Sequence, residues 1–292
     1  MINLTNYLEG ISFSTFNFWF TRISLNIFRI MKLGDDRKFY EIGTLYDDEN
    51  NLEIRILSSC NESEDAIAAD FNRYKLRPEY AVGRPIDWNR CEEAYDKLLI
   101  GCHLIRAFRL SSSDPDDYLN PVHRAIEWLS TTDFYTAPGS SRYHDNEPKG
   151  LLKHSLRVAL KMVDLNMLPD FKSVKLEDAV LAGLVHDWCK IGLYESYDRN
   201  VKDDSGKWVT KKEYRTKQAS LTCFGHGVSS MFLANRFFRF DVDASLAIRW
   251  HMGFCRVADS DMNELQQANE TYPIVHMLQF ADQLSITKYN KD

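Results

Sequence analysis

The sequence predicts a mainly α protein with a smaller β-containing N-terminal region. Two patterns carry this prediction. From about residue 90 to residue 286, apolar residues recur at the three- and four-residue spacing of amphipathic helices. Within residues 36–60, two short β-prone runs instead flank a polar turn. The chain has 292 residues, 44% of them hydrophobic, which is enough to bury one or two cores.

The composition excludes several classes of protein. Charged residues make up 27% of the chain, close to the norm for folded proteins, so wholesale disorder is excluded. Asp and Glu outnumber Lys and Arg by 42 to 36, which argues against coating duplex nucleic acid through a global positive field. Asn and Arg residues interrupt the apolar stretch over 11–30, so we expect no membrane span. The six cysteines form no CxxC pair, which favours a reduced, cytoplasmic protein.

Residues 1–75 are expected to form a small β-containing region of unknown role. The runs 39–46 and 52–57 predict a hairpin around an acidic, amide-rich turn. The aromatic run before residue 31 is compatible with either a further β element or an N-terminal extension. Mixed charges with prolines and a glycine predict a loop-rich linker over 60–88.

Helices are expected along most of the remaining chain. We expect residues 76–124 to form a helical linker or accessory region, and residues 125–287 to form the domain that carries the chemistry. Asn120 followed by Pro121 is typical of a helix start. Periodicity predicts helices over 90–110, 121–130, 150–165, 176–189, 225–238, 243–252 and 272–286.

A polar segment over 200–217 interrupts these helices and predicts a small hairpin. Basic residues alternate there with aromatic ones, namely Lys207, Trp208, Lys211, Lys212, Tyr214, Arg215 and Lys217. A solvated hairpin explains each of these residues taken singly. Taken together they favour a nucleotide or oligonucleotide ligand over a sugar phosphate, because cations meet phosphates and aromatic rings stack on bases.

Histidines and aspartates occupy helix positions that are otherwise apolar. Asp282, for example, extends a stripe formed by Val275 and Leu278. In chain order the residues of this kind are His154, His186, Asp187, His226, His251 and Asp282. Each one alone is more simply explained as a satisfied core residue. On successive helices, however, the set indicates a metal site, because burying these groups together is costly without a cation and nitrogen and oxygen donors suit divalent ions.

In this order the residues resemble those of the HD-domain metal-dependent phosphohydrolases, all-helical enzymes named for the adjacent His-Asp pair. The resemblance covers about residues 125–287 and implies an HD-domain helical bundle. The amino-acid sequences of several segments are similar to those in the HD domain of bacterial 3′-to-5′ exoribonucleases. These segments are residues 133–138, 142–144, 150–156, 186–192 and 249–253. The OB barrel that those enzymes carry has no evident counterpart in residues 1–75.

The resemblance implies that two divalent metal ions are bound, drawn from Mn, Fe, Ni, Co or Zn. It places one ion with His154, His186, Asp187 and Asp282, and the other with His226, His251 and a bridging Asp187. Two such ions lower the pKa of a shared water and neutralise the charge on phosphoryl oxygens.

Three further residues are expected to act beside Asp187 in catalysis. Lys190 follows Asp187 by three residues and is expected on the same face, where it can neutralise a substrate phosphate; a solvated lysine is the alternative. Arg142 and His144 precede the first ligand helix and are expected to border the site, with His144 a candidate proton donor to the leaving oxygen. Tyr194 either stacks on a base or packs in the core.

The expected activity is hydrolysis of a phosphodiester in a nucleotide, a cyclic or short oligonucleotide, or an RNA 3′ end. A nucleotidase or nucleoside-triphosphate hydrolase would use the same ions, and some HD-fold proteins with this ligand order hold two irons and are oxygenases. A non-catalytic nucleotide-binding regulator fits the complete ligand set less well. The expected partners are a nucleotide or short oligonucleotide and single-stranded RNA, without a membrane; the sequence predicts no oligomeric state.

Overall fold

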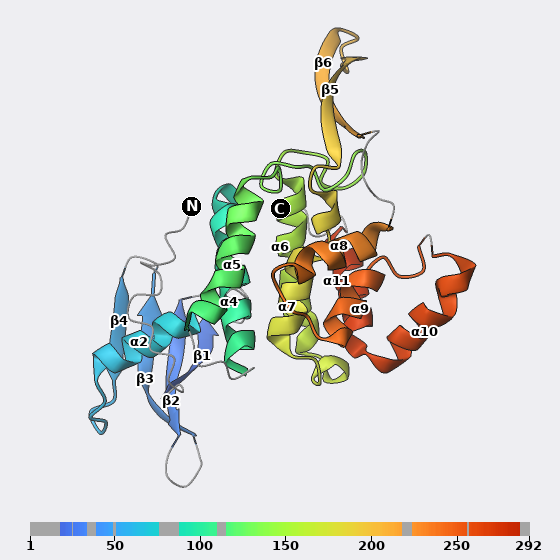
Figure 1. Ribbon diagram of the computed structural model, residues 1–292. Coiled ribbons are helices and arrows are strands. Elements are labelled where there is room, and N and C mark those ends of the chain that lie inside the picture. The colour runs from blue at the N-terminus through green and yellow to red at the C-terminus, as the bar shows by residue number, and fades with distance from the viewer. Residues whose placement is uncertain are drawn as a thin grey trace. The chain divides into compact units, whose positions relative to one another are not determined.

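The computed structural model describes residues 18–24, 26–33, 39–48, 51–75, 88–109, 115–217, 224–255 and 257–286 (Figure 1). The chain divides into two compact units, residues 1–85 and residues 86–292. Among the described residues, the first unit combines a four-stranded sheet with a helix, and the second is helical apart from a hairpin. The predicted fold class, mainly α with a smaller β-containing N-terminal region, is therefore confirmed.

The sheet of the first unit is an antiparallel meander. Its strands follow one another in chain order, as β1 (Phe18–Ser24), β2 (Ile27–Leu33), β3 (Phe39–Asp47) and β4 (Leu52–Ile56). The hairpin predicted within 36–60 is confirmed as β3 and β4. The aromatic run before residue 31 is compatible in sequence with a β element or an N-terminal extension. The structure shows β strands over residues 18–24 and 27–33. Residues 1–17 lie outside the described part.

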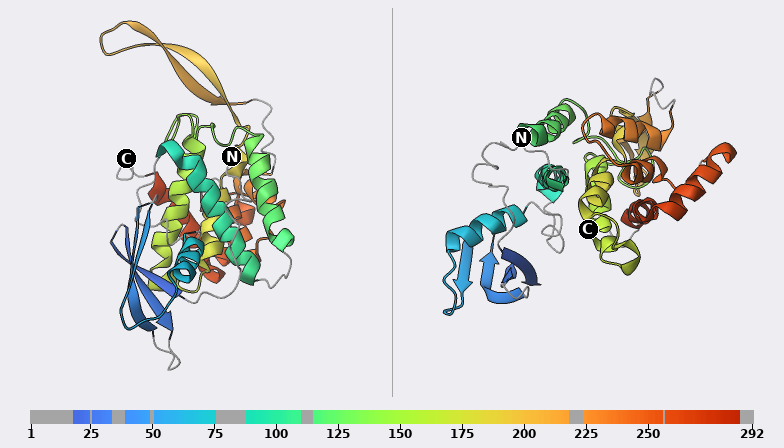
Figure 2. Two further views of the ribbon diagram at one scale, coloured as in Figure 1. Left: turned by 90° about the vertical axis from the view of Figure 1, so that its left-hand side faces the viewer. Right: turned by 60° about the horizontal axis from the view of Figure 1, so that its bottom comes forward.

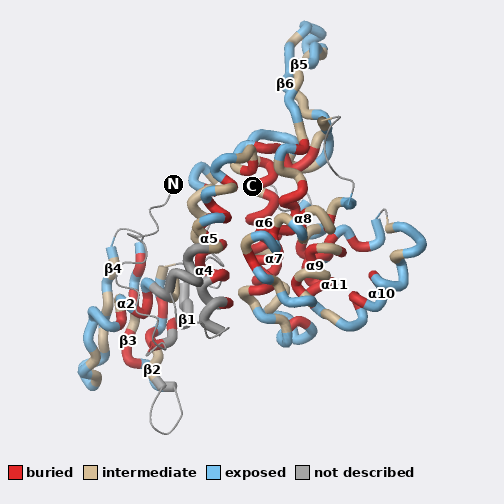
Figure 3. The backbone as a smooth tube through the Cα atoms, viewed as in Figure 1, coloured by how far each residue is buried: buried red, intermediate tan, exposed pale blue. Residues whose placement is uncertain are grey.

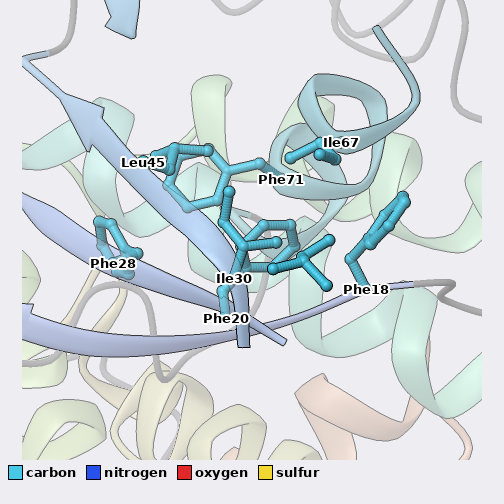
Figure 4. Close-up of a cluster of buried hydrophobic side chains, with 8 residues drawn as sticks. Phe18, Phe20, Phe28, Ile30, Leu45, Ile67 and Phe71 are labelled. Carbon is cyan, nitrogen blue, oxygen red and sulfur yellow. The ribbon is translucent and has the colours of Figure 1, made fainter. Parts of the chain in front are cut away.

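One face of this sheet is covered by α2 (Glu64–Tyr74), which packs against β1 and β4. Figure 4 shows the resulting core, in which the Phe71 ring of α2 meets Phe20 and Phe28, each with 5.0 Å between ring centroids. Ile67 and Phe71 are four residues apart and fully buried, so they form an apolar helical stripe. The loop-rich linker expected over 60–88 is therefore wrong for residues 64–74.

The second unit is built around α7, whose residues from 178 to 185 are all buried (Figure 3). Helix α7 contacts α4, α6, α9 and α11, because its apolar residues face outward on every side. The bounds of the helices are α4 (Cys91–Arg109), α5 (Pro115–Ser130), α6 (Gly150–Asn166), α7 (Leu176–Val185), α8 (His226–Asn235), α9 (Val242–Trp250), α10 (Met262–Thr271) and α11 (Pro273–Ser285). Single 3₁₀ turns are η1 (Trp88–Arg90), η2 (Pro169–Phe171), η3 (Trp188–Lys190) and η4 (Asp259–Asp261).

Two predicted helix boundaries are wrong, and one helix was not predicted. Helix α5 begins at Pro115 rather than Pro121, because a second proline at N1 followed by two aspartates is the stronger start signal. Helix α7 ends at Val185, and the chain continues into η3 instead of remaining helical to residue 189. Helix α10 was not predicted, because its few buried residues form too narrow a stripe to stand out.

The predicted hairpin within 200–217 is confirmed, and it begins earlier than expected. It pairs β5 (Tyr194–Lys202) with β6 (Trp208–Thr216) in continuous antiparallel register from Tyr194↔Thr216 to Lys202↔Trp208. Figures 1 and 2 show it standing clear of the helices of its own unit. Among the described residues, none of the helices combines the length and apolar character that crossing a bilayer requires.

Candidate metal centre

The six predicted ligands come from five segments of the second unit. His154 lies in α6, and Asp282 lies in α11. His186 and His251 each follow the last residue of a helix, α7 and α9 respectively, and His226 is the first residue of α8. Asp187 leaves the helical conformation, with φ −108° and ψ 16°. The chain therefore delivers these side chains mainly from helix ends rather than from helix faces.

Three of the histidines have their Nδ1 atoms held by neighbouring acceptors. His186 Nδ1–H donates to the carbonyl of Gly183 at 2.7 Å, and His251 Nδ1–H donates to that of Ile248 at the same distance. The Nδ1 of His154 lies 3.3 Å from the hydroxyl oxygen of Ser285, which itself donates to a carbonyl and can therefore accept. Each neutral ring then presents a bare Nε2 lone pair, which is the usual state of a metal-binding histidine.

These Nε2 atoms converge with the Asp282 carboxylate. His154 Nε2 lies 3.2 Å from His186 Nε2 and 3.1 Å from Asp282 Oδ1, while His186 Nε2 lies 3.9 Å from the same oxygen. Ligand atoms about 2.1 Å from a common ion are roughly 3–4 Å apart, so this triangle has the edge lengths of a coordination sphere. When both rings are neutral and protonated at Nδ1, their Nε2 lone pairs face each other at 3.2 Å and repel unless a cation lies between them.

Asp187 connects this triangle to the other two histidines. Its Oδ2 lies 3.4 Å from His154 Nε2 and 3.5 Å from His186 Nε2. Its Oδ1 lies 2.8 Å from His226 Nε2 and 3.6 Å from His251 Nε2. One carboxylate thus turns one oxygen to each half of the cluster, which is the position a bridging ligand needs.

The His251 imidazole tests whether these residues fit a metal ion. The residue is buried and its Nε2 has no hydrogen-bond partner, although a buried polar atom normally has one. The donor atoms of His186, Asp187 and His251 lie within 4.8 Å of one another, as do those of His154, His186 and Asp282. A cation would satisfy His251 and relieve the facing lone pairs, so the donor set fits a divalent ion.

The electrostatics of the cluster keep its two carboxylates ionised. Burial acts to raise the pKa of Asp187, but Lys190 and the surrounding imidazoles hold it well below its usual value. Asp282 is likewise lowered against the effect of burial, chiefly by His154. Burial lowers the pKa of His186, whereas the two carboxylates outweigh burial at His154 and raise its pKa to about 8. The lowered pKa values of Asp187 and Asp282 mean that both carboxylates are ionised at neutral pH.

Two glycines set the distances between the ligand-bearing helices. A Cβ at Gly227 would lie 1.9 Å from the carbonyl oxygen of Arg249, so α8 rests directly on the backbone of α9 just before His251. A Cβ at Gly183 would lie 3.1 Å from the Cα of Ala159, so α7 packs closely on α6. The convergence of donor atoms thus depends on positions where a side chain is excluded.

Lys190 lies where the sequence predicted it, beside Asp187. Its ammonium donates to Asp187 Oδ2 at 2.6 Å across the turn formed by η3. Burial acts to lower the pKa of Lys190, but the Asp187 charge outweighs it and holds the pKa above its ordinary value. Tyr194 is half-buried, and burial raises its pKa, with smaller contributions from the Lys190 charge, which lowers it, and the Asp187 charge, which raises it.

His144 lies at the edge of the cluster, whereas Arg142 lies further out. The His144 and His154 rings are 5.2 Å apart between centroids, and His144 Nδ1 lies 3.2 Å from Asp145 Oδ2. Arg142 is exposed. His144 is thus next to the predicted ligands, and Arg142 lies at the surface.

The sequence did not indicate two residues that contact the cluster. Asp145 accepts from His144 and from Arg157 Nη2 at 2.5 Å, and these contacts outweigh burial and lower its pKa to about 2. Cys189 places its sulfur 3.3 Å from His226 Nδ1, on the opposite side of that ring from Asp187. Asp145 lies in an irregular loop and Cys189 in a buried turn, so helical periodicity marks neither.

Comparison with known proteins agrees with this site. Residues 151–287 match the family model described as the HD domain, a segment that includes all six predicted ligands. The match supports placing this part of the chain in the HD-domain superfamily, whose members are in general metal-dependent hydrolases. Searches of curated proteins and of solved structures found no match. The predicted likeness to the exoribonuclease branch stays a prediction.

Proposed function

We propose that this protein is a metal-dependent phosphohydrolase that cleaves a phosphodiester in a nucleotide, a cyclic or short oligonucleotide, or an RNA 3′ end. The observation that carries the proposal is the convergence of four histidine nitrogens on the two oxygens of Asp187, with the Asp282 carboxylate beside two of them. A phosphodiester resists attack because its negative charge repels a nucleophile. Divalent cations held beside a buried, ionised carboxylate would overcome that repulsion.

The residues divide into two ligand sets. His154 and His186 lie at Asp187 Oδ2 and also contact Asp282, whereas His226 and His251 lie at Asp187 Oδ1. Divalent ions bound there would lower the pKa of a water and neutralise the non-bridging oxygens of the substrate. The fixed Nδ1 hydrogen bonds hold the imidazoles in the tautomer that binds metal, which reduces the cost of reorganisation.

Lys190 and His144 supply the remaining charge and proton chemistry. The Lys190 ammonium is buried against Asp187 and can donate a second hydrogen bond to a substrate phosphoryl oxygen. His144 is about one quarter exposed, and Asp145 holds its Nδ1 so that Nε2 can donate a proton to the leaving oxygen. Arg157 in turn fixes Asp145, so this arrangement does not depend on the mobility of a surface loop.

The experiment is the Asp187→Ala substitution, measured against the wild-type protein after loading with Mn, Fe, Co, Ni or Zn. We expect hydrolysis of bis(p-nitrophenyl) phosphate to fall to background and bound metal to fall well below the wild-type content, because both ligand sets lose their shared carboxylate. Asp164→Ala is the control, since Asp164 is an exposed aspartate of α6 that pairs with Lys161. Circular dichroism checks that helix content is retained. Turnover by the Asp187 variant would refute the proposal.

Product analysis separates the proposed diesterase from its alternatives. A diesterase acting on a dinucleotide or a cyclic nucleotide leaves a mononucleotide, whereas a nucleotidase or nucleoside-triphosphate hydrolase releases phosphate or pyrophosphate. A di-iron oxygenase would instead consume oxygen when loaded with iron. The buried lysine favours the phosphohydrolase, since an ammonium held beside the cluster suits an anionic substrate.

A further inference from the structure

The two faces of the β5–β6 hairpin differ in chemistry. Side chains alternate along each strand, and the register is continuous, so residues directly opposite share a face. One face, called here the aromatic face, carries Tyr194, Ser196, Asp198, Asn200 and Lys202 of β5 with Trp208, Thr210, Lys212, Tyr214 and Thr216 of β6. The other, called the paired face, carries Glu195, Tyr197, Arg199, Val201, Val209, Lys211, Glu213 and Arg215.

On the paired face, most of the charged side chains and the aromatic ring contact one another. Arg215 contacts Glu195 at 2.7 Å and lies over the Tyr197 ring at 5.4 Å from its centroid. The Tyr197 hydroxyl donates to Glu213 at 2.8 Å, and Arg199 contacts the same carboxylate. These contacts are internal to the hairpin, so this face has little left to offer a ligand except Lys211.

The aromatic face is arranged differently. Trp208 is 65% exposed near the tip, with Lys202 5.3 Å from its ring centroid. Tyr214 lies further down the same face, and Lys212 stands between the two rings along β6. Trp208 is exposed and Tyr214 is partly exposed. Accessible rings with cations between them are the pattern by which proteins hold single-stranded nucleic acid, because each base stacks and each phosphate meets a positive charge.

The aromatic face leads to the metal centre. At the base of the hairpin, β5 begins at Tyr194, four residues after Lys190 at the end of η3. The base is anchored, since Gly192 N–H donates to Asp133 Oδ1 at 2.7 Å and Lys217 N–H donates to the Leu193 carbonyl at 2.9 Å. From Trp208 to Thr216 the strand runs roughly 27 Å, whereas stacked bases are about 3.4 Å apart. A ligand reaching from the tip to the centre therefore spans several nucleotides.

We infer that the aromatic face of the β5–β6 hairpin binds a single-stranded nucleic acid and directs its end to the metal centre. This inference deepens the proposed function, on which it rests, by naming a polymeric substrate rather than a mononucleotide. Thr210, Asn200 and Ser196 make the face polar, which suits nucleic acid better than the apolar core of a protein interface. The acidic tip at Asp203 and Asp204 lies beyond the strands, and the one carboxylate on the face itself, Asp198, is opposite Lys212 and is outnumbered by Lys202 and Lys212.

Neighbouring lysines on β6 provide a matched test. Lys212 lies on the aromatic face and Lys211 on the paired face, and both are exposed. The measurement is fluorescence anisotropy of metal-loaded protein with labelled, cleavage-resistant phosphorothioate oligouridylate and, separately, oligothymidylate. We expect Trp208→Ala and Tyr214→Ala each to weaken binding about tenfold. Lys212→Ala should also lower the slope of log affinity against log salt by about 0.7, whereas Lys211→Ala should leave it unchanged.

Equal effects of Lys211→Ala and Lys212→Ala, or unaltered binding by Trp208→Ala, would overturn the inference. It would also be overturned if Trp208→Ala converted a dimer to a monomer in light scattering without changing oligonucleotide binding, since the face would then serve a second copy. The two probes show whether ribose or deoxyribose is preferred. Face-dependent binding without hydrolysis of bis(p-nitrophenyl) phosphate would contradict the proposed function alone, and hydrolysis without oligonucleotide binding would contradict this inference alone.

Discussion

Asp187 is the residue on which both halves of the candidate metal centre depend. It lies directly after a helix rather than within one, and this position lets each carboxylate oxygen face a different pair of histidines. His186 and His251 share a second local device, a ring nitrogen that donates to the carbonyl three residues earlier at a helix end. Identical short-range geometry at two places thus orients two ligands without any long-range contact.

His226→Ala tests the division into two sets. We expect bound metal to fall from two ions per chain to one, because His226 contacts Asp187 Oδ1 and lies on the far side of Asp187 from His154. Hydrolysis should fall by more than the roughly 10–100-fold that loss of an outer-shell partner causes. The measurements are elemental analysis and turnover of the same preparation.

His276→Ala is the matched control for that variant. Its ring stacks on Phe280, with 5.8 Å between centroids, and the residue is not part of the donor cluster. It should leave both metal content and turnover unchanged. Full activity of the His226 variant would mean that a single ion suffices.

Asp96 gives a prediction about stability and pH. The residue is 6% exposed, and burial raises its pKa to about 6 although the Tyr135 hydroxyl donates to it at 2.6 Å. A folded-state pKa above the unfolded value of about 3.9 favours folding at low pH, and this contribution is lost as pH rises through about 6. The loss amounts to roughly 3 kcal/mol at most.

Asp96→Asn should therefore remove a fall in the free energy of unfolding between about pH 4 and pH 6, measured by urea denaturation. The amide keeps an acceptor for Tyr135 but carries no charge. Asp164→Asn, at an exposed position, should retain the wild-type pH profile. Parallel profiles for wild type and Asp96→Asn would show that this carboxyl does not titrate as its burial implies.

Residue types predicted six side chains that the structure brings together, but not the residues that support them. The six candidate donors could be found because polar residues on apolar helix positions need an explanation. Asp145, Cys189 and Ser285 contact the same cluster, yet an aspartate in a loop, a buried cysteine and a serine near a helix end are common in any protein. Their roles depend on long-range contacts that local sequence does not encode.

At the scale of elements, periodicity succeeded where a helix buries a wide stripe. Helices α4, α6 and α11 begin and end within a residue or two of their predicted limits. It failed for α10, whose stripe is narrow, and for the end of α7, where the apolar pattern continues past Val185 while the backbone does not. A buried turn and a buried helix have similar composition, so the pattern alone does not separate them.

Gly227→Ala tests the contact between α8 and α9. Alanine normally stabilises a helix by about 1 kcal/mol relative to glycine. Here its Cβ would lie 1.9 Å from a backbone oxygen, so the helices must separate, and overpacking of this kind costs about 1–3 kcal/mol. We expect a lower free energy of unfolding and weaker binding of the ion near His226, measured by urea denaturation and metal titration.

Ser229→Ala, in the same helix, is the control for that change. Its hydroxyl contacts the Gly225 carbonyl at an exposed position, so the effect should stay within about 0.5 kcal/mol. A stabilised Gly227→Ala protein with normal metal affinity would show that the close approach of α8 and α9 is not needed.

At the scale of the whole molecule, the two units have different physical bases. The first is a meander whose aromatic core is closed by α2, and the second is a set of helices around α7 with a hairpin standing clear of them. The order of the candidate ligands along the chain indicated the second unit because they come from five different helices or helix ends. The first unit carries no comparable pattern, so its sheet could be predicted in part but its role could not.

The central claim is that two cations are bound on either side of Asp187. The most direct measurement is anomalous scattering from crystals of the Mn-loaded protein, recorded at the Mn absorption edge. We predict two peaks in the second unit, one bounded by His154, His186 and Asp282 and the other by His226 and His251, with an Asp187 oxygen at each. Peaks elsewhere, or no peak at these residues at saturating metal, would contradict the account.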